Sequence, residues 1–142
     1  MPKLLPAAIL IYATLAGSAA AAGPARNHPI LGTWTFPIPG KQCSETYVYL
    51  PDGTTRISSG EEISRSRYTI SAKPTAGGYY KLSDVLTKDN EKPDCVGGIS
   101  HVGDKSVNYI RFSTEGDQMI MCRQPSPQQC FGPLYKARDN SI

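Results

Sequence analysis

The chain has 142 residues, 15 of them basic and 12 acidic, which gives a formal net charge of +3. This excess is small, and no run of Lys or Arg forms a basic stripe, so the composition argues against a nucleic-acid partner. The length suits one domain rather than several.

The first 22 residues have the pattern of a cleaved signal peptide. Lys3 supplies a positive start, residues 4–15 are mostly apolar, and a run of small residues ends in Ala20-x-Ala22. The apolar core is shorter than the ~20 residues that a membrane-spanning helix needs, and no later segment is apolar enough to span a bilayer. We therefore predict cleavage after Ala22 and an exported protein, periplasmic or secreted, whose mature form has no membrane span.

Four cysteines remain in the exported part: Cys43, Cys95, Cys122 and Cys130. An even number of cysteines in a small exported domain predicts two disulfides. Zinc is the alternative, but zinc ligands usually come in closer pairs, and no His lies near the tightest spacing here. We expect no metal site and no cofactor. Sequence leaves three pairings open, of which we predict Cys43–Cys95 and Cys122–Cys130.

Beyond residue 30 the hydrophobic pattern has a period of two, and turn residues recur at the spacing typical of an all-β sandwich or barrel. Pro51-Asp52-Gly53 and Glu115-Gly116 have the residue types that tight turns favour. The polar stretch 87–105 predicts a long loop. We predict eight strands, at residues 32–37, 43–50, 54–58, 67–72, 79–86, 106–113, 118–123 and 130–137.

The predicted fold is all-β: a single eight-stranded antiparallel up-and-down barrel with two disulfides. A flexible lead-in at residues 23–30 precedes the barrel domain at residues 31–138, and a tail follows at residues 139–142. If the strands alternate in direction along the chain, four connections lie at one end, and all four cysteines lie at or beside it. These connections are residues 37–42, 59–66, 87–105 and 124–129.

Gly32-x-Trp34 opens the first predicted strand, and the run YVYLPDGT follows at residues 47–54. Both features resemble small exported bacterial domains of the lipocalin-like (calycin) superfamily. The resemblance implies an eight-stranded up-and-down barrel whose mouth lies opposite the end where the chain enters. It also implies that Trp34 closes the bottom of the barrel beneath a basic residue, and the candidates for that residue are Arg123, Lys136 and Arg138.

The sequence offers no complete catalytic set. Its two histidines are His28, in the lead-in, and His101, which we interpret as a solvated loop residue. Neither stands in a pattern that combines nucleophile, base and orienting group, so we predict that the protein is not an enzyme. Asp84, Asp89 and Asp94 lack the ligand spacing of a calcium loop and are interpreted as a charged loop surface.

Bulky side chains occur on both faces of several predicted strands. For a barrel of this size we favour an interior filled by side chains, with a ligand cavity as the alternative. The residues expected to line such a cavity are Trp34, Tyr47, Tyr49, Tyr109, Met119 and Met121. The predicted function is a monomeric binding protein that takes a small apolar ligand at the disulfide-tied end. The alternative is a secreted or periplasmic interaction module of the enzyme-inhibitor type, which meets a protein partner through loop 87–105.

Overall fold

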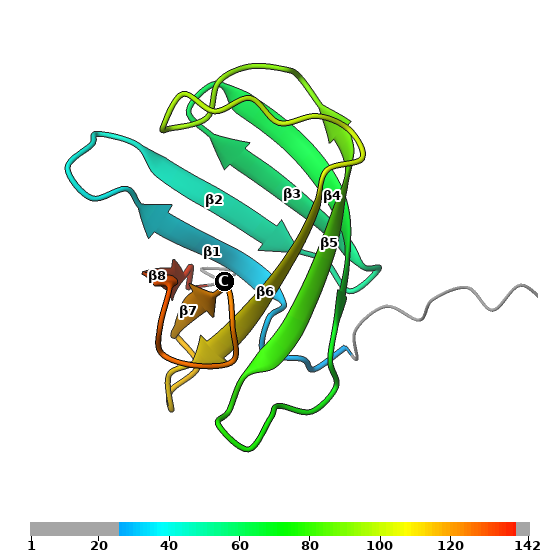
Figure 1. The fold of residues 1–142 in the computed structure, drawn as a ribbon, viewed down its shortest axis with the longest axis vertical. Coiled ribbons are helices and arrows are strands. Elements are labelled where there is room, and N and C mark those ends of the chain that lie inside the picture. Colours follow the sequence, from blue (N-terminus) through cyan, green and yellow to red (C-terminus); the bar gives the residue numbers. More distant parts are fainter. Residues whose placement is uncertain (1–25, 139–142) are drawn as a thin grey trace, which may run out of the picture.

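In the computed structural model, which describes residues 26–138, eight strands form a closed antiparallel barrel in which β8 closes on β1 (Figure 1). The predicted fold class is therefore confirmed, as is the disulfide pairing. Within the described residues no helix is long and apolar enough to cross a bilayer. The predicted signal peptide and tail lie outside these residues. The strands are β1 (Gly32–Pro37), β2 (Ser44–Tyr49), β3 (Thr54–Ser59), β4 (Glu62–Ile70), β5 (Tyr80–Asp89), β6 (Lys105–Phe112), β7 (Gln118–Cys122) and β8 (Cys130–Lys136).

Strand β4 differs most from the prediction, because it begins at Glu62 rather than at residue 67. Its first half alternates with the opposite polarity to the other strands. The inward side chains Glu62, Ser64 and Ser66 are buried, whereas Ile63 is exposed. A search for strands whose apolar residues alternate toward the core does not find such a segment. The inner face of the barrel wall is therefore polar along the first half of β4.

Trp34 closes one end of the barrel. It is fully buried, and its Nε1 donates a hydrogen bond of 2.8 Å to the carbonyl of Ile30. Lys136 is the basic partner: its Nζ lies 5.2 Å from the centre of the Trp34 ring and donates to the carbonyl of Pro29 at 3.1 Å. Gly32 has a φ of +114°, and a Cβ there would lie 3.3 Å from Cε of Lys136. The Gly-x-Trp spacing thus leaves room for the Lys136 side chain.

The segment just before β1 is packed at this closed end and differs from the flexible lead-in expected there. His28 and Ile30 are both buried. The Nδ1 of His28 accepts from the amide of Ile30 at 3.1 Å, and its Nε2 lies 3.3 Å from the carbonyl of Ser71. Burial lowers the pKa of His28, which favours the neutral ring. The segment is ordered because it covers apolar surface that the barrel leaves open.

The closed half of the barrel is filled by one hydrophobic cluster. Its buried members come from the lead-in and from seven strands: Ile30, Trp34, Tyr49, Tyr68, Leu82, Ile110, Met119, Met121 and Leu134. Among residues 26–138, no apolar cluster of this kind fills the other half, where the inward side chains of β4 are polar.

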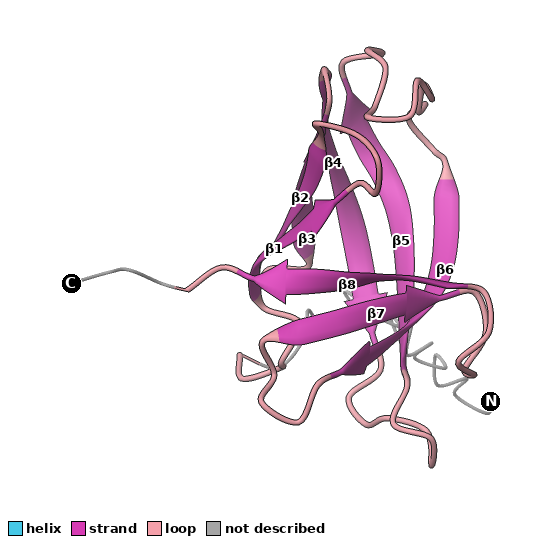
Figure 2. Ribbon diagram, turned by 90° about the vertical axis from the view of Figure 1, so that its left-hand side faces the viewer, coloured by secondary structure: helices cyan, strands magenta, loops and turns pink. Residues whose placement is uncertain are grey.

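The barrel wall has an opening beside β6. In Figure 2, β7 and β8 run nearly horizontally, at a large angle to β4, β5 and β6, which run nearly vertically. Strand β6 pairs with β5 from Lys105 onward, but it pairs with β7 only from Tyr109 onward. The first half of β6 therefore has no β7 neighbour. Both views also place the β7–β8 connection well below the β5–β6 loop, so the disulfide-bearing rim is slanted rather than level.

Candidate functional site

The half of the barrel beyond the core contains a cavity. Its inner part is about 160 Å³ and is lined by side chains that include Tyr47, Tyr49 and Met121. A hollow of about 260 Å³ at the mouth continues it, and the two parts share Asp84 and Ser106 among their lining residues. The filled or nearly filled interior favoured from sequence therefore describes the closed half, whereas this half holds the cavity named as the alternative. The polar inner face of β4 and the incomplete β6–β7 pairing leave space that apolar side chains do not fill.

The cavity also reaches the surface through the wall. A hollow of about 340 Å³ lies where β6 lacks its β7 neighbour, and Arg123 and Gln129 line its outer side. It shares Asn108, Met121 and Phe131 with the inner cavity. The interior is thus accessible both from the rim and from the side.

Five carboxylates line the mouth: Glu45, Glu62, Asp84, Asp94 and Asp104. Asp94 and Asp104 accept hydrogen bonds from amides of the rim loop, whereas the other three accept from side-chain hydroxyls. Glu45 accepts hydrogen bonds from the hydroxyls of Tyr47, at 2.5 Å, and Ser59, at 2.9 Å. Glu62 accepts a hydrogen bond from Ser64, two residues along the same strand. Asp84 accepts one from Ser66, which lies across the sheet on β4. These hydroxyl donors are all neutral, so none of them compensates the negative charge.

Burial dominates the electrostatics of the cavity. It raises the pKa of Asp84, an effect that the hydrogen bond from Ser66 only partly opposes. It also raises the pKa of Glu62, with a further contribution from the neighbouring Asp89. The pKa values of Tyr47 and Tyr49 are raised above their usual range by burial and nearby carboxylates, so both phenols stay neutral.

One buried polar group in the cavity has no partner. Thr55 lies on β3, is 1% exposed and lines the inner part. Its Oγ1 is buried and makes no hydrogen bond. A buried hydroxyl without a partner costs roughly 1–3 kcal/mol, so this position favours a ligand atom that can bond to it.

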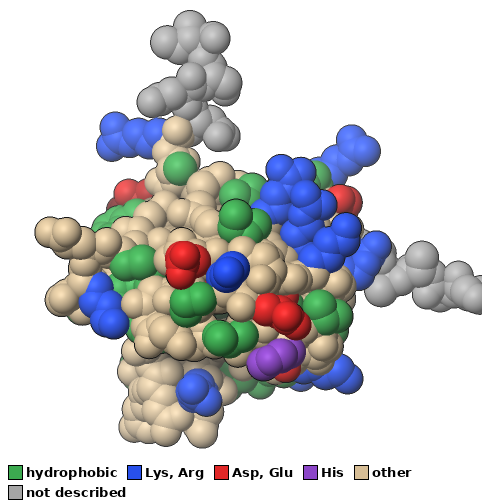
Figure 3. Space-filling view, turned by 90° about the horizontal axis from the view of Figure 1, so that it is seen from above, with side chains coloured by type: hydrophobic (Ala, Val, Ile, Leu, Met, Phe, Trp, Pro, Cys, Tyr) green, Lys and Arg blue, Asp and Glu red, His purple; other side chains and the backbone are tan. Residues whose placement is uncertain are grey.

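The rim above the cavity is formed in part by the β5–β6 loop, which is held in place by several contacts. It is shorter than the predicted loop 87–105, because β5 runs to Asp89 and β6 begins at Lys105. The Cys43–Cys95 bridge joins it to the start of β2. Asp94 accepts from the amides of Val96 and Gly98 at 2.9 and 2.7 Å. At the β3–β4 turn, a Cβ on Gly60 would lie 2.9 Å from the Asp94 carbonyl carbon, so turn and loop are in close contact. Figure 3 looks onto this end, where hydrophobic, acidic, basic and histidine side chains lie side by side.

No protein-family model, curated protein or solved structure matches this chain. Its function must therefore follow from the chemistry of the molecule itself. Within residues 26–138, no group of three or more His, Cys, Asp or Glu is arranged to hold a metal ion.

The structure brings together three of the six residues expected to line a cavity, Tyr47, Tyr49 and Met121. Trp34 and Met119 belong to the buried core at the closed end. Tyr109 follows the inward-facing Asn108 on β6 and points the other way, because successive side chains of a strand alternate.

Sequence reasoning missed the acidic residues of the cavity. Asp84 was interpreted as part of a charged loop surface, but it faces the interior between Leu82 and Leu86, both of which are buried. Counting in steps of two from these leucines would have found it. Counting back in steps of two from the buried Tyr68 passes Ser66 and Ser64 and reaches Glu62, which therefore also faces the interior.

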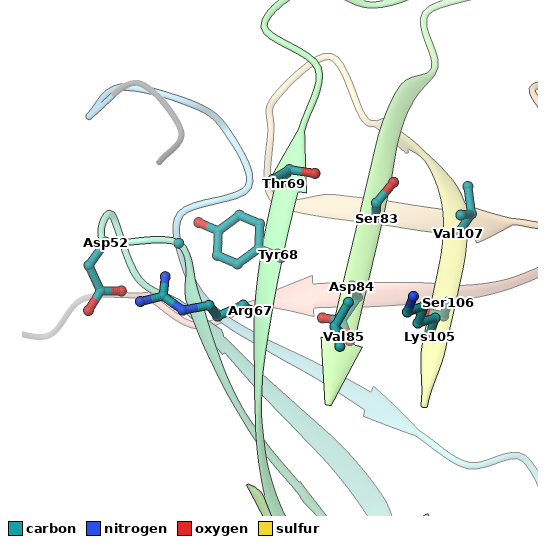
Figure 4. Close-up of a pocket in the computed structure, with 11 residues that line it drawn as sticks. Asp52, Arg67, Tyr68, Thr69, Ser83, Asp84, Val85, Lys105, Ser106 and Val107 are labelled. Atoms are coloured by element: carbon teal, nitrogen blue, oxygen red, sulfur yellow. The ribbon is translucent and has the colours of Figure 1, made fainter. Parts of the chain in front are cut away.

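A second hollow, of about 290 Å³, lies on the outer wall over β4, β5 and β6 (Figure 4). Outward side chains line it, among them Thr69, Ser83 and Val107, and Arg67 reaches toward Asp52 at its edge. Most of its lining residues lie on the outside of the wall, whereas the interior cavity gathers the buried carboxylates and the unpaired hydroxyl of Thr55, so we place the candidate site inside the barrel.

Proposed function

We propose that this chain is an exported, lipocalin-like binding protein that takes a small ligand inside the barrel and catalyses no reaction. The observation that carries the proposal is the connected interior cavity, which opens at the rim and through the wall above a packed core. Small barrels of this type can hold one small ligand. The ligand's apolar body would lie against Tyr47, Tyr49 and Met121.

Two further observations support the parts of this proposal. The Gly32-x-Trp34 motif with Lys136 over the Trp34 ring matches what the lipocalin-like resemblance implied for the closed end. Two disulfides are formed, Cys43–Cys95 and Cys122–Cys130, as is usual in oxidising compartments outside the cytoplasm.

The test is native mass spectrometry of the protein purified from its own host, with two variants at positions of β6. Ser106 faces the cavity, whereas Tyr109 on the same strand lines none of its parts. We expect wild type and the control Tyr109→Trp to carry a small molecule and Ser106→Trp to lose it, because the indole occupies the cavity. Wild-type protein that is always ligand-free, or a Ser106→Trp variant that keeps its ligand, would contradict the proposal.

A second candidate function is a protein-interaction module of the inhibitor type, acting through loop 87–105. It is favoured by three apolar side chains on this tethered loop, Val96, Ile99 and Val102, which are 62, 53 and 63% exposed. Replacing all three by Ser should abolish recovery of a partner in pull-down, with unchanged thermal stability. Unchanged recovery with the triple variant argues against this surface.

A further inference from the structure

The cavity places carboxylates beside aromatic faces. The rings of Tyr47 and Tyr49 are nearly parallel, with centroids 6.5 Å apart, and both line the inner cavity. Asp84 lines the inner cavity and the mouth, and it is close enough to Tyr49 to raise the pKa of that phenol. Glu45 and Glu62 line the mouth. Negative charge and π-faces are the two features that attract an organic cation.

The protein supplies little positive charge to balance these carboxylates. Among the described residues that line the mouth, Lys105 is the only basic one. A lysine paired with Asp84 or Glu62 would lower their pKa values. Both pKa values are instead raised, with burial as the largest cause. At Glu62 and Asp84, burial therefore outweighs any nearby positive charge, and a single lysine at the mouth faces several carboxylates.

The orphaned Oγ1 of Thr55 is a second and independent sign of a ligand. Thr55 lines the inner cavity from β3, whereas Asp84 is on β5 and Glu45 on β2. A polar ligand atom that reaches this depth would satisfy a buried hydroxyl that the chain itself leaves unpaired.

We infer that the ligand is a small organic cation: a primary ammonium group carried on an aromatic or similarly flat apolar body. This inference rests on the proposed binding function and names its ligand class. The ammonium lies among Glu45, Glu62 and Asp84, and the body lies against Tyr47 and Tyr49.

The chemistry of the lining suits this ligand better than a neutral or anionic one. A primary ammonium has three N–H donors and no acceptor, and the carboxylates of Glu45, Glu62 and Asp84 retain acceptor positions beyond their hydroxyl partners. Hydrogen bonds between two charged groups are about twice as strong as neutral ones. An anion of the same shape would meet several acidic side chains in a partly desolvated site.

The experiment is isothermal titration calorimetry at neutral pH with three probes that share one phenyl body: 2-phenylethylamine, 2-phenylethanol and 3-phenylpropionate. They carry a positive charge, no charge and a negative charge. We expect the amine to bind at least tenfold more tightly than the alcohol, and the propionate to bind most weakly. Asp84→Asn should weaken amine binding by about tenfold and change alcohol binding less than twofold. Lys105→Gln should tighten amine binding.

Glu115→Gln is the matched control, because it removes the same charge from an exposed position in the β6–β7 turn, away from the cavity. It should bind all three probes like wild type. Alcohol binding as tight as amine binding, or amine binding unchanged in both Asp84→Asn and Glu62→Gln, overturns the cation inference and leaves the binding function standing. Absence of binding for all three probes contradicts both.

Discussion

Asp84 lines the cavity, and the burial of its charge there opposes folding. Its single protein hydrogen bond comes from Ser66, and burial raises its pKa. Natural proteins tolerate such sites where function requires them, at a cost in stability. The same reasoning applies to Glu62, which is 7% exposed.

Asp84→Asn should therefore stabilise the ligand-free protein. The amide keeps an oxygen that can accept from Ser66, and it removes a carboxylate whose burial raises its pKa. A gain of about 1 kcal/mol would raise Tm by roughly 4 °C in a domain of this size. Thermal unfolding followed by circular dichroism measures the change, with Glu115→Gln as the control. A lower Tm for Asp84→Asn would mean that the carboxylate has a stabilising partner.

Gly32 is constrained by its backbone and by its neighbour. Its φ is +114°, and an added Cβ would lie 3.3 Å from Cε of Lys136. Gly32→Ala should reduce stability by about 1–3 kcal/mol. Lys136→Ala on its own removes the side chain over Trp34. In the double variant the losses of stability should be less than additive, because the contact between the new Cβ and the Lys136 side chain is absent while the backbone strain at residue 32 remains. Urea unfolding of the four proteins tests this, and full additivity would contradict the steric contact.

At the scale of elements, the two disulfides differ in what they constrain. Cys43–Cys95 spans 52 residues and ties loop 87–105 to β2, whereas Cys122–Cys130 spans 8 residues across the β7–β8 hairpin. On loop-entropy grounds the longer loop gains about 4 kcal/mol and the shorter one about 2.5 kcal/mol.

Replacing Cys43 and Cys95 together by Ala should therefore destabilise the protein more than replacing Cys122 and Cys130. Denaturant unfolding measures both losses. Hydrogen exchange should show loss of protection in residues 90–104 for the first pair only. An equal loss of protection in both double variants would mean that the loop is held by its hydrogen bonds and not by the disulfide.

A row of like charges crosses the outer face of three strands. Arg56 on β3 lies directly opposite Arg65 on β4, which lies opposite Lys88 on β5, and all three are exposed. Like charges in direct cross-strand register are destabilising.

Arg65→Glu should stabilise the barrel by about 0.5–1 kcal/mol, because both neighbours then meet an opposite charge. The gain should fall at high salt, where exposed charges are screened. Lys73→Glu makes the same charge change in the exposed β4–β5 turn and is the control. Equal effects of the two substitutions in thermal unfolding would show that net charge, rather than the row, matters.

For the whole molecule, the buried carboxyls make stability depend on pH in a defined direction. The folded state raises the pKa of Glu62 and Asp84, so it binds protons more tightly than the unfolded chain. Their contribution to stability therefore falls as the pH rises through the folded pKa values. It is most favourable below the ordinary carboxyl pKa of about 4. His28 acts in the opposite sense, because its lowered pKa costs stability as the pH falls through the mildly acidic range.

The Glu62→Gln/Asp84→Asn double variant separates these effects. The contribution of His28 is common to both proteins and cancels in the difference. We expect the variant's stability advantage over wild type to be largest at neutral pH and to shrink as the pH is lowered toward about 4. Free energies of unfolding across this range measure the difference, and an advantage that grows on acidification would contradict the raised pKa values.

Much of the architecture could be read from local pattern. The period-two alternation and the turn residues at Asp52-Gly53 and Glu115-Gly116 located the strands, with β4 as the main exception. There the polar residues of the alternation point inward. The apolar alternation therefore predicted a strand that begins only at residue 67. This start lies beyond Glu62, Ser64 and Ser66, whose side chains shape the cavity.

The sequence by itself determined that the chain is all-β with eight strands, and that its four cysteines form two disulfides, because alternation, turn residues and an even cysteine count are local features. The closure of the barrel and the burial of Trp34 at its end were implied by the lipocalin-like resemblance, and the structure shows both. Only the tertiary structure decided that Lys136 covers Trp34 and that Glu45, Glu62 and Asp84 meet in one cavity. These residues come from strands far apart in sequence. Their meeting depends on strand register and on the incomplete β6–β7 pairing, which no local pattern encodes.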